Sequence, residues 1–193
     1  MMMRVEYLSL KWQAMGWLVV GRQAQALAAF DRLLQRWPED AYGLSSRAHL
    51  HAQAGRLEQA LSDNERWVKV DEDNAQAWFN RGFLLESLER LQEALVSFVR
   101  ATELSPKLDR AWYGQGLVLI RLERYEEAVA ALKRNTELQP MSPYGWYQLA
   151  RVHVDRRNPE EAVKIIRHLK GFEPKVAAQL ERETGLVAGS STS

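Results

Sequence analysis

The histidines are the side chains of this 193-residue sequence that could most readily bind a metal ion or transfer a proton. His49 and His51 form an H-x-H pair, a spacing that occurs in metal sites. On a helix, however, residues two apart point to different faces. His168 has no potential partner near it in the sequence. The histidines therefore predict neither a metal site nor a bound cofactor.

The carboxylates follow helical rather than catalytic patterns. They cluster at expected helix starts or pair with Arg and Lys at helical spacing. No two of them form the isolated, apolar-flanked pair that acid–base catalysis uses. The chain also lacks a G-x-S-x-G motif, a phosphate-binding glycine loop and an H-E-x-x-H motif. The sequence therefore predicts a protein that is not an enzyme.

Composition limits the partners and the location. The net charge of +1 creates no field that would attract DNA, RNA or an acidic membrane. The absence of cysteine excludes disulfides and thiolate metal sites. No run approaches the ~20 apolar residues of a membrane span, and Glu6 and Lys11 interrupt the segment that resembles a signal peptide. We expect a cytoplasmic protein without nucleic-acid binding or membrane insertion.

A tryptophan recurs at one interval, because Trp78, Trp112 and Trp146 lie 34 residues apart. Extending this frame gives five contiguous blocks: 7–40, 41–74, 75–108, 109–142 and 143–176. The fourth position of each block is Leu or Trp, and the eighth is Ala or Gly. The twentieth is always alanine: Ala26, Ala60, Ala94, Ala128 and Ala162. The thirty-second is Pro38, Glu72, Pro106, Pro140 and Pro174.

The pattern predicts two amphipathic helices in each block, because apolar residues recur three and four apart in two runs. The small residues at the eighth and twentieth positions would let the two helices approach closely, with the fourth-position Trp or Leu filling the space beside them. The proline would end the second helix. Asp40, Asn74 and Ser142 would then cap the next one, with Pro143 at a first helical position.

These positions resemble the tetratricopeptide repeat, and the resemblance covers residues 7–176. It implies an all-α fold, an α-solenoid of five helix-turn-helix repeats in a right-handed superhelix. A short capping helix is expected over 176–184 and a disordered tail over 188–193, so that residues 1–187 form one domain. The second block departs most, with Asn64 at the aromatic twenty-fourth position and Trp67 at the small twenty-seventh.

The resemblance implies that first helices line a concave surface, through the second, fifth, sixth, ninth, twelfth and thirteenth positions of each block. Many of these residues are large, apolar or aromatic although the scaffold does not require it, as in binding hot spots. The candidate binding residues are Lys11, Trp12, Met15, His49, Phe79, Asn80, Phe83, Arg110, Tyr113, Leu117, Arg121, Tyr147 and Arg151. For Phe79, Tyr113 and Tyr147, packing within their own repeat is an equal alternative.

Two further expectations come from the family. The clamp of cations and asparagines that grips a chaperone's C-terminal carboxylate matches no window of three blocks, so we exclude that ligand. His51 and His153 occupy the eleventh position, where the family has a packed tyrosine, and we expect both to pack. Arg110, Arg121 and Arg151 lie on candidate groove positions and would suit an acidic ligand, unless they are simply solvated.

The predicted function is binding of a protein or peptide segment in an apolar, aromatic groove, as an adaptor or small cytosolic chaperone. One alternative is a scaffold subunit or homodimer that uses its N-terminal end and convex face. Its candidate interface is the apolar excess of the first helix, Leu8, Trp12, Leu18 and Val19, because large exposed apolar patches mark interaction sites. A third alternative is a regulatory module for an enzyme on another chain.

Overall fold

The computed structural model describes residues 2–189, and this part of the chain contains eleven helices and no strand. It divides into two compact units, one ending at Arg90 and the other starting at Leu91. Unit 1 contains α1 (Met2–Val19), α2 (Gln23–Arg36), α3 (Ala41–Gln53), α4 (Leu57–Val70) and α5 (Ala75–Ser87). Unit 2 contains α6 (Leu91–Leu104), α7 (Asp109–Arg121), α8 (Tyr125–Leu138), α9 (Pro143–Asp155), α10 (Pro159–Lys170) and α11 (Pro174–Thr184).

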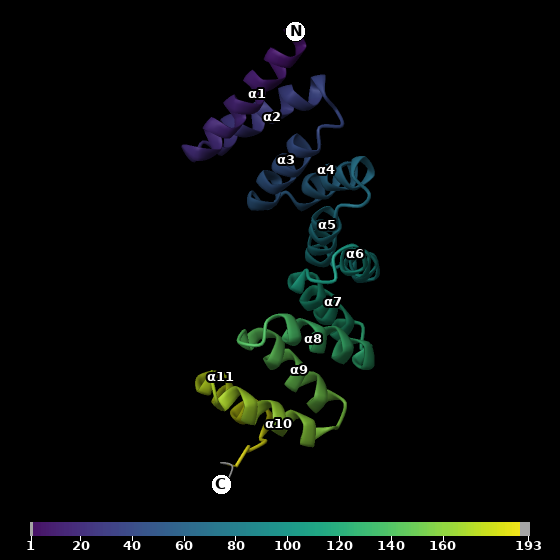
Figure 1. Cartoon of the computed structure of the whole chain (residues 1–193), viewed down its shortest axis with the longest axis vertical. Helices are drawn as coiled ribbons and strands as arrows, with labels where there is room; N and C mark the ends of the chain where they lie inside the picture. The colour runs from purple at the N-terminus through teal and green to yellow at the C-terminus, as the bar shows by residue number, and fades with distance from the viewer. Residues whose placement is uncertain (1, 190–193) are drawn as a thin grey trace. The chain divides into compact units, whose positions relative to one another are not determined.

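Within each unit, every helix packs against the next one along the chain (Figure 1). From the second block on, the first helix begins at block position 1 and the second at position 17. This register confirms the predicted all-helical repeat architecture. Two boundaries differ from the prediction, since α1 begins at Met2 rather than at residue 7, and α11 begins at Pro174 rather than at 176.

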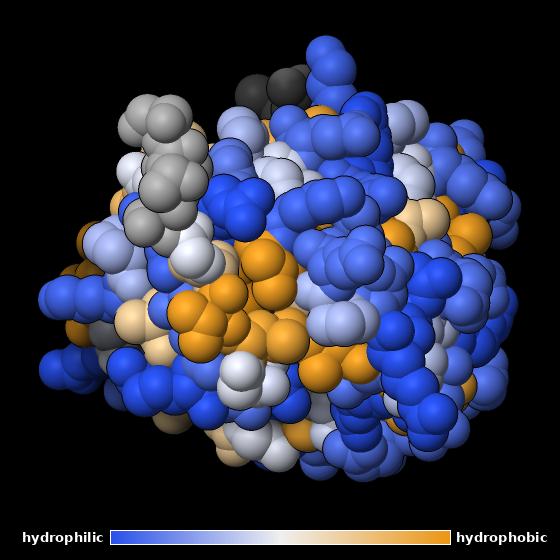
Figure 2. Space-filling view, turned by 90° about the horizontal axis from the view of Figure 1, so that it is seen from below, coloured by the Kyte–Doolittle hydropathy of each residue, from blue (hydrophilic) through white to orange (hydrophobic). Residues whose placement is uncertain are grey.

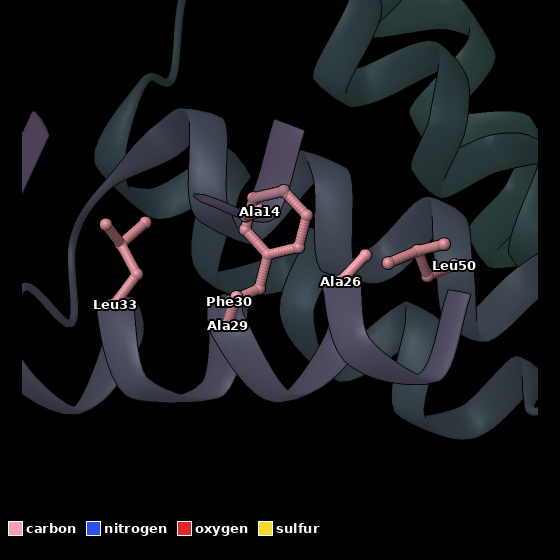
Figure 3. Close-up of a cluster of buried hydrophobic side chains, with 6 residues drawn as sticks. All are labelled: Ala14, Ala26, Ala29, Phe30, Leu33 and Leu50. Atoms are coloured by element: carbon pink, nitrogen blue, oxygen red, sulfur yellow. The ribbon is translucent and has the colours of Figure 1, made fainter. Parts of the chain in front are cut away.

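In the four repeats whose helices lie within one unit, the small residues lie where the two helices meet, as predicted. The alanine at position 20 is fully buried in all five repeats, and the Ala or Gly at position 8 is buried in each. Figure 3 shows the arrangement in the first repeat, where the Phe30 ring extends from α2 towards Ala14 of α1. Small side chains at these points let the helices approach closely, and larger side chains fill the layer between them.

The turn inside each repeat uses one backbone device five times. Position 15 has a positive φ of 57 to 73° in every repeat, at Gly21, Gly55, Glu89, Glu123 and Arg157. The amide of position 16 donates to the carbonyl of position 11, and the amide of position 15 donates to that of position 12. These two bonds define a Schellman motif, which satisfies the last carbonyls of the first helix.

The turn between repeats is stabilised by a tryptophan hydrogen bond, whereas we expected the proline at position 32 to end the second helix. The indole Nε1 of Trp78, Trp112 and Trp146 donates to the backbone carbonyl six residues earlier, at 2.7, 3.0 and 2.8 Å. These tryptophans are only half-buried, so they bind the inter-repeat turn as well as fill space. The proline is not what ends the second helix, because α4 ends at Val70 with Glu72 in its place.

The helix starts are confirmed in part. Asp40 and Asn74 accept hydrogen bonds from backbone amides of α3 and α5. Ser142 occupies the N-cap of α9, but its side chain makes no capping bond there. Pro143 is at the first turn of α9, as predicted, whereas Pro174 starts α11 instead of ending α10.

The C-terminal helix packs its apolar side inward. Leu180 is fully buried, while Gln179 and Arg182 are exposed. Figure 2, which views the chain from this end, shows a small apolar patch surrounded by hydrophilic side chains. Ala188, the first residue of the predicted disordered tail, is buried, and its backbone is hydrogen-bonded to Lys170 and Glu181. Residues 190–193 of that prediction lie outside the described residues.

Candidate functional site

The candidate binding residues all lie on first helices of repeats. In unit 1 they come from α1, α3 and α5, and in unit 2 from α7 and α9. Within each unit these residues fall into separate groups, and the groups differ in the kinds of side chain that they contain.

A pocket of about 120 Å³ lies between α3, α4 and α5 of unit 1. We call it the α3–α5 pocket. It brings together four of the candidate residues, His49, Phe79, Asn80 and Phe83, and its remaining lining residues are Ser45, Ala48, Ala52, Asn64 and Leu84. Phe83 is 54% exposed. An aromatic side chain that is neither buried nor part of the helix-packing layer is available for contact with a partner.

The lining of this pocket is already partly ordered by hydrogen bonds. Ser45 Oγ donates to the Tyr42 carbonyl at 3.0 Å, and Asn80 Oδ1 accepts from Gln76 Nε2 at 2.7 Å. Asn64 differs from both. Its side chain is 1% exposed, and neither Oδ1 nor Nδ2 has a hydrogen-bond partner. Asn64 departs from the repeat pattern at position 24 but was not among the candidate binding residues.

The candidate residues of α1 form a different surface. Val5, Leu8, Trp12, Met15 and Val19 recur three and four residues apart, and we call them the α1 stripe. Trp12 is 66% exposed and Val19 87% exposed. Leu18, predicted for the same interface, instead packs against the core around Phe30. The Lys11 ammonium lies 4.3 Å from the centre of the Tyr42 ring, so this lysine already has a contact within the chain.

Unit 2 has two hollows beside its candidate residues. One, of about 360 Å³, lies between α7, α8 and α9 and includes Arg110 and Tyr113. The other, of about 300 Å³, lies between α9 and α11 and includes Tyr147. Tyr144, which is 69% exposed, lines both. Leu117 and Arg121 also lie on α7 but line neither hollow.

Arg151, predicted to hold an acidic ligand, already binds a carboxylate of its own chain. Its Nη1 lies 3.2 Å from Glu183 Oε2 of α11, and Tyr147 Oη donates to the same oxygen at 2.5 Å. The hydrogen bond from Tyr147 is the main reason that the pKa of Glu183 lies below its ordinary value. An acidic ligand at Arg151 would therefore have to displace Glu183.

A partly buried ion-pair network in unit 1, centred on the buried Asp63, was not predicted. Arg47 of α3 donates to both carboxylate oxygens of Asp63 at 2.7 and 2.6 Å and to Asp31 at 2.7 Å. Hydrogen bonding to Asp63 raises the pKa of Arg47, against the effect of burial. Arg81 pairs with Glu65 at the same spacing of sixteen residues. Opposite charges at positions 25 and 7 of successive repeats were the available signal.

One further hollow, of about 430 Å³, lies at Arg36 to Asp40 and has no assigned role. Its Asp40 carboxylate is already bonded to Tyr7 Oη and the Gly43 amide.

Among the described residues, no group of three or more His, Cys, Asp or Glu could hold a metal ion. None of the described helices has the length and apolarity to cross a membrane.

Two family models match most of the chain. A family model described as tetratricopeptide repeat matches residues 18–72, 97–135 and 113–170. A second model with that description matches residues 75–108, which is the third block. No curated protein sequence matches the chain.

Solved structures share the fold at low sequence identity. A crystal structure of MamA protein is 18% identical, with a TM-score of 0.83, and the match covers 95% of this chain and 98% of that one. MamA from Desulfovibrio magneticus RS-1 is also 18% identical, with a TM-score of 0.78 and coverage of 93% and 97%. YrrB, described as a TPR protein with an unusual peptide-binding site, is 20% identical, with a TM-score of 0.79 and 88% of each chain covered.

Proposed function

The chain belongs to the tetratricopeptide repeat family, and from that premise we propose that it binds a segment of a partner protein at the α3–α5 pocket, as an adaptor or small chaperone. The family's fold is one of protein–protein interaction. The single observation that carries the proposal is the meeting of His49, Phe79, Asn80 and Phe83 around one pocket. Nothing in the repeat scaffold requires that combination of aromatic and polar side chains.

The geometry suits an extended segment rather than a small charged ligand. Phe79 and Phe83 lie one helical turn apart on α5, so their rings can contact neighbouring side chains of a bound chain. The pocket beneath them accepts one side chain. Interfaces of this kind concentrate their binding energy in a few aromatic anchors around a desolvated centre. The description of YrrB as a peptide-binding protein is compatible with this use of the fold.

Panning a random peptide library on the purified chain tests the proposal. We expect selected peptides to bind wild type and to lose about thirtyfold in affinity with Phe83→Ala, which corresponds to a hot-spot loss of ~2 kcal/mol. Val96→Ala is the matched control, because Val96 is also an exposed apolar residue, at 62% against 54% for Phe83, but lies on a second helix, α6. Peptides whose affinity falls equally with both changes, or no selected peptides at all, would count against the proposal.

The α1 stripe supports a second candidate function, self-association. Apolar residues at alternating spacings of three and four form the seam by which helices pair, and no charged residue belongs to the stripe. A two-fold axis would place one stripe against the same stripe of a second copy. We expect light scattering at micromolar concentration to show a dimer, and Trp12→Glu with Val19→Glu to yield a monomer. A monomeric wild type would eliminate this candidate.

A further inference from the structure

Position 24 is where the second repeat departs from the other four. The residues at this position are Phe30, Phe98, Leu132 and Ile166 in the other repeats, and each is at most 1% exposed. In the first, fourth and fifth repeats, whose two helices lie within one unit, they fill the layer between these helices. In the second repeat the same position is Asn64, which is equally buried. A smaller polar side chain there leaves the space that becomes the α3–α5 pocket.

The buried, unpaired amide of Asn64 lowers the stability of the folded chain. A buried carboxamide without partners loses the hydrogen bonds that it made to water in the unfolded chain. Buried polar atoms in native proteins are nearly always paired, so an unpaired amide needs an explanation. No group of the described chain pairs with it, although Asn64 lines the pocket. Local violations of this kind are expected at functional sites.

The other lining residues restrict what can pair with the amide. None of the nine residues around the pocket is Asp, Glu, Lys or Arg, and the one ionisable residue among them, His49, is exposed to solvent. A charged group entering it would be desolvated without an opposite charge, which is strongly unfavourable. An aliphatic group would leave both atoms of the amide unpaired. The complementary group is therefore uncharged and carries one donor and one acceptor side by side.

We propose that the α3–α5 pocket recognises a primary carboxamide, the side chain of a glutamine or asparagine in the bound segment. Both Asn64 amide atoms are enclosed by the chain, so the Asn64 side chain rotates toward the bound group. Its Oδ1 then accepts from the ligand N–H, and its Nδ2 donates to the ligand carbonyl. The apolar part of the ligand side chain lies against Ala48, Ala52 and Leu84. The volume of about 120 Å³ is well above the ~10–15 Å³ that one water molecule requires. This inference rests on the proposed function, because it names the residue type that the pocket selects.

The experiment compares peptide selection on wild type with selection on Asn64→Leu. Leucine is the natural residue at this position of the fourth repeat, Leu132, and it would fill the pocket. We expect wild type to select peptides with glutamine or asparagine at one fixed position. Asn64→Leu should still select peptides through Phe79 and Phe83, but without that preference, and its thermal midpoint should rise by a few degrees because an unpaired polar group is removed.

One selected peptide then provides a direct measurement. Changing its glutamine to glutamate or methionine should weaken binding to wild type by about tenfold or more, since the Asn64 amide is left unpaired. The same changes should leave the affinity for Asn64→Leu unaltered. If Asn64→Leu does not fold, Asn64→Ala replaces it, because alanine removes the amide without adding volume.

The outcomes separate the inference from the proposed function. Peptides that both proteins select equally, with no preference for glutamine or asparagine, would overturn the inference and leave peptide binding intact. Failure of wild type and variant to select any peptide would overturn both.

Discussion

At the scale of single residues, position 15 has the same backbone conformation in every repeat but not the same residue type. Repeats 1 and 2 use Gly21 and Gly55, whereas repeat 4 places Glu123 at φ 58°. A side chain with a Cβ is strained in this region, and glycine is not. We predict that Glu123→Gly stabilises the chain by about 0.5–1 kcal/mol, measured as a higher urea midpoint with an unchanged m-value.

The reciprocal change serves as the control. Gly55→Ala places a Cβ at φ 73°, where no other atom lies within 4 Å of it. Any loss of stability, expected at about 1 kcal/mol, then comes from the backbone conformation and not from a clash. If Glu123→Gly destabilises the chain, the Glu123 side chain contributes more than the strain costs.

A second residue-scale prediction concerns His153, which is 4% exposed with an unpaired Nδ1. Burial, and then the charge of Arg156, lower the pKa of His153 in the folded chain, with Lys133 acting in the same sense and Glu161 opposing. The unfolded chain therefore binds the proton more readily. Stability should fall as pH decreases through about 6.5, the ordinary histidine pKa, and should keep falling until the folded-state pKa is reached.

His153→Leu should remove part of this pH dependence, as measured by urea midpoints between pH 7.5 and 5. Part would remain, because burial also lowers the pKa of the half-buried His51. His49→Gln is the control, since it deletes an exposed histidine. Equal pH slopes for wild type and His153→Leu would show that His153 does not cause the effect.

At the scale of helices, the Arg47 network joins α2, α3 and α4. The Asp63 side chain is 5% exposed and that of Arg47 is 17% exposed. Without Arg47, the buried Asp63 keeps only a longer contact of 3.7 Å with Arg66, so most of the compensation for its charge is lost. We predict that Arg47→Met lowers the free energy of unfolding by about 3–5 kcal/mol. Adding Asp63→Leu should recover most of the loss.

Arg134→Met is the comparison for this prediction, since Arg134 and Glu137 form an exposed pair on α8 at 2.7 Å. Its loss should cost less than about 1 kcal/mol. Similar effects for Arg47→Met and Arg134→Met would mean that burial does not govern the strength of the Arg47 network.

The helices could be predicted from the sequence because small residues recur at two fixed positions of every repeat. The alanine at position 20 and the small residue at position 8 set the register, and the helices start where that register places them. The pairing of Arg151 with Glu183 could not be predicted, because these residues are 32 apart and meet only when α11 packs against α9. The repeat positions of the candidate binding residues could be predicted from the sequence. The hollow beside Asn64 could not, because its size depends on packing. The sequence showed only that Asn64 departs from the repeat pattern.

At the scale of the whole chain, packing within each unit is local. Helices pack against the next helix, with added contacts between α7 and α9 and between α9 and α11. Stability in such arrays is approximately a sum of repeat terms and nearest-neighbour terms. A shortened chain that contains complete repeats should therefore keep its structure, at reduced stability.

We predict that residues 1–108, which end with the third block, fold as a helical fragment, whereas residues 1–74 are largely unfolded. The reason is that about three repeats are needed before stacking outweighs the loss of conformational entropy. Circular dichroism should show the same helical signal per residue for 1–108 as for the full chain, and a lower urea midpoint. The m-value should fall with the smaller surface exposed on unfolding. A fragment 1–108 without helical signal would mean that the repeats depend on contacts beyond their neighbours.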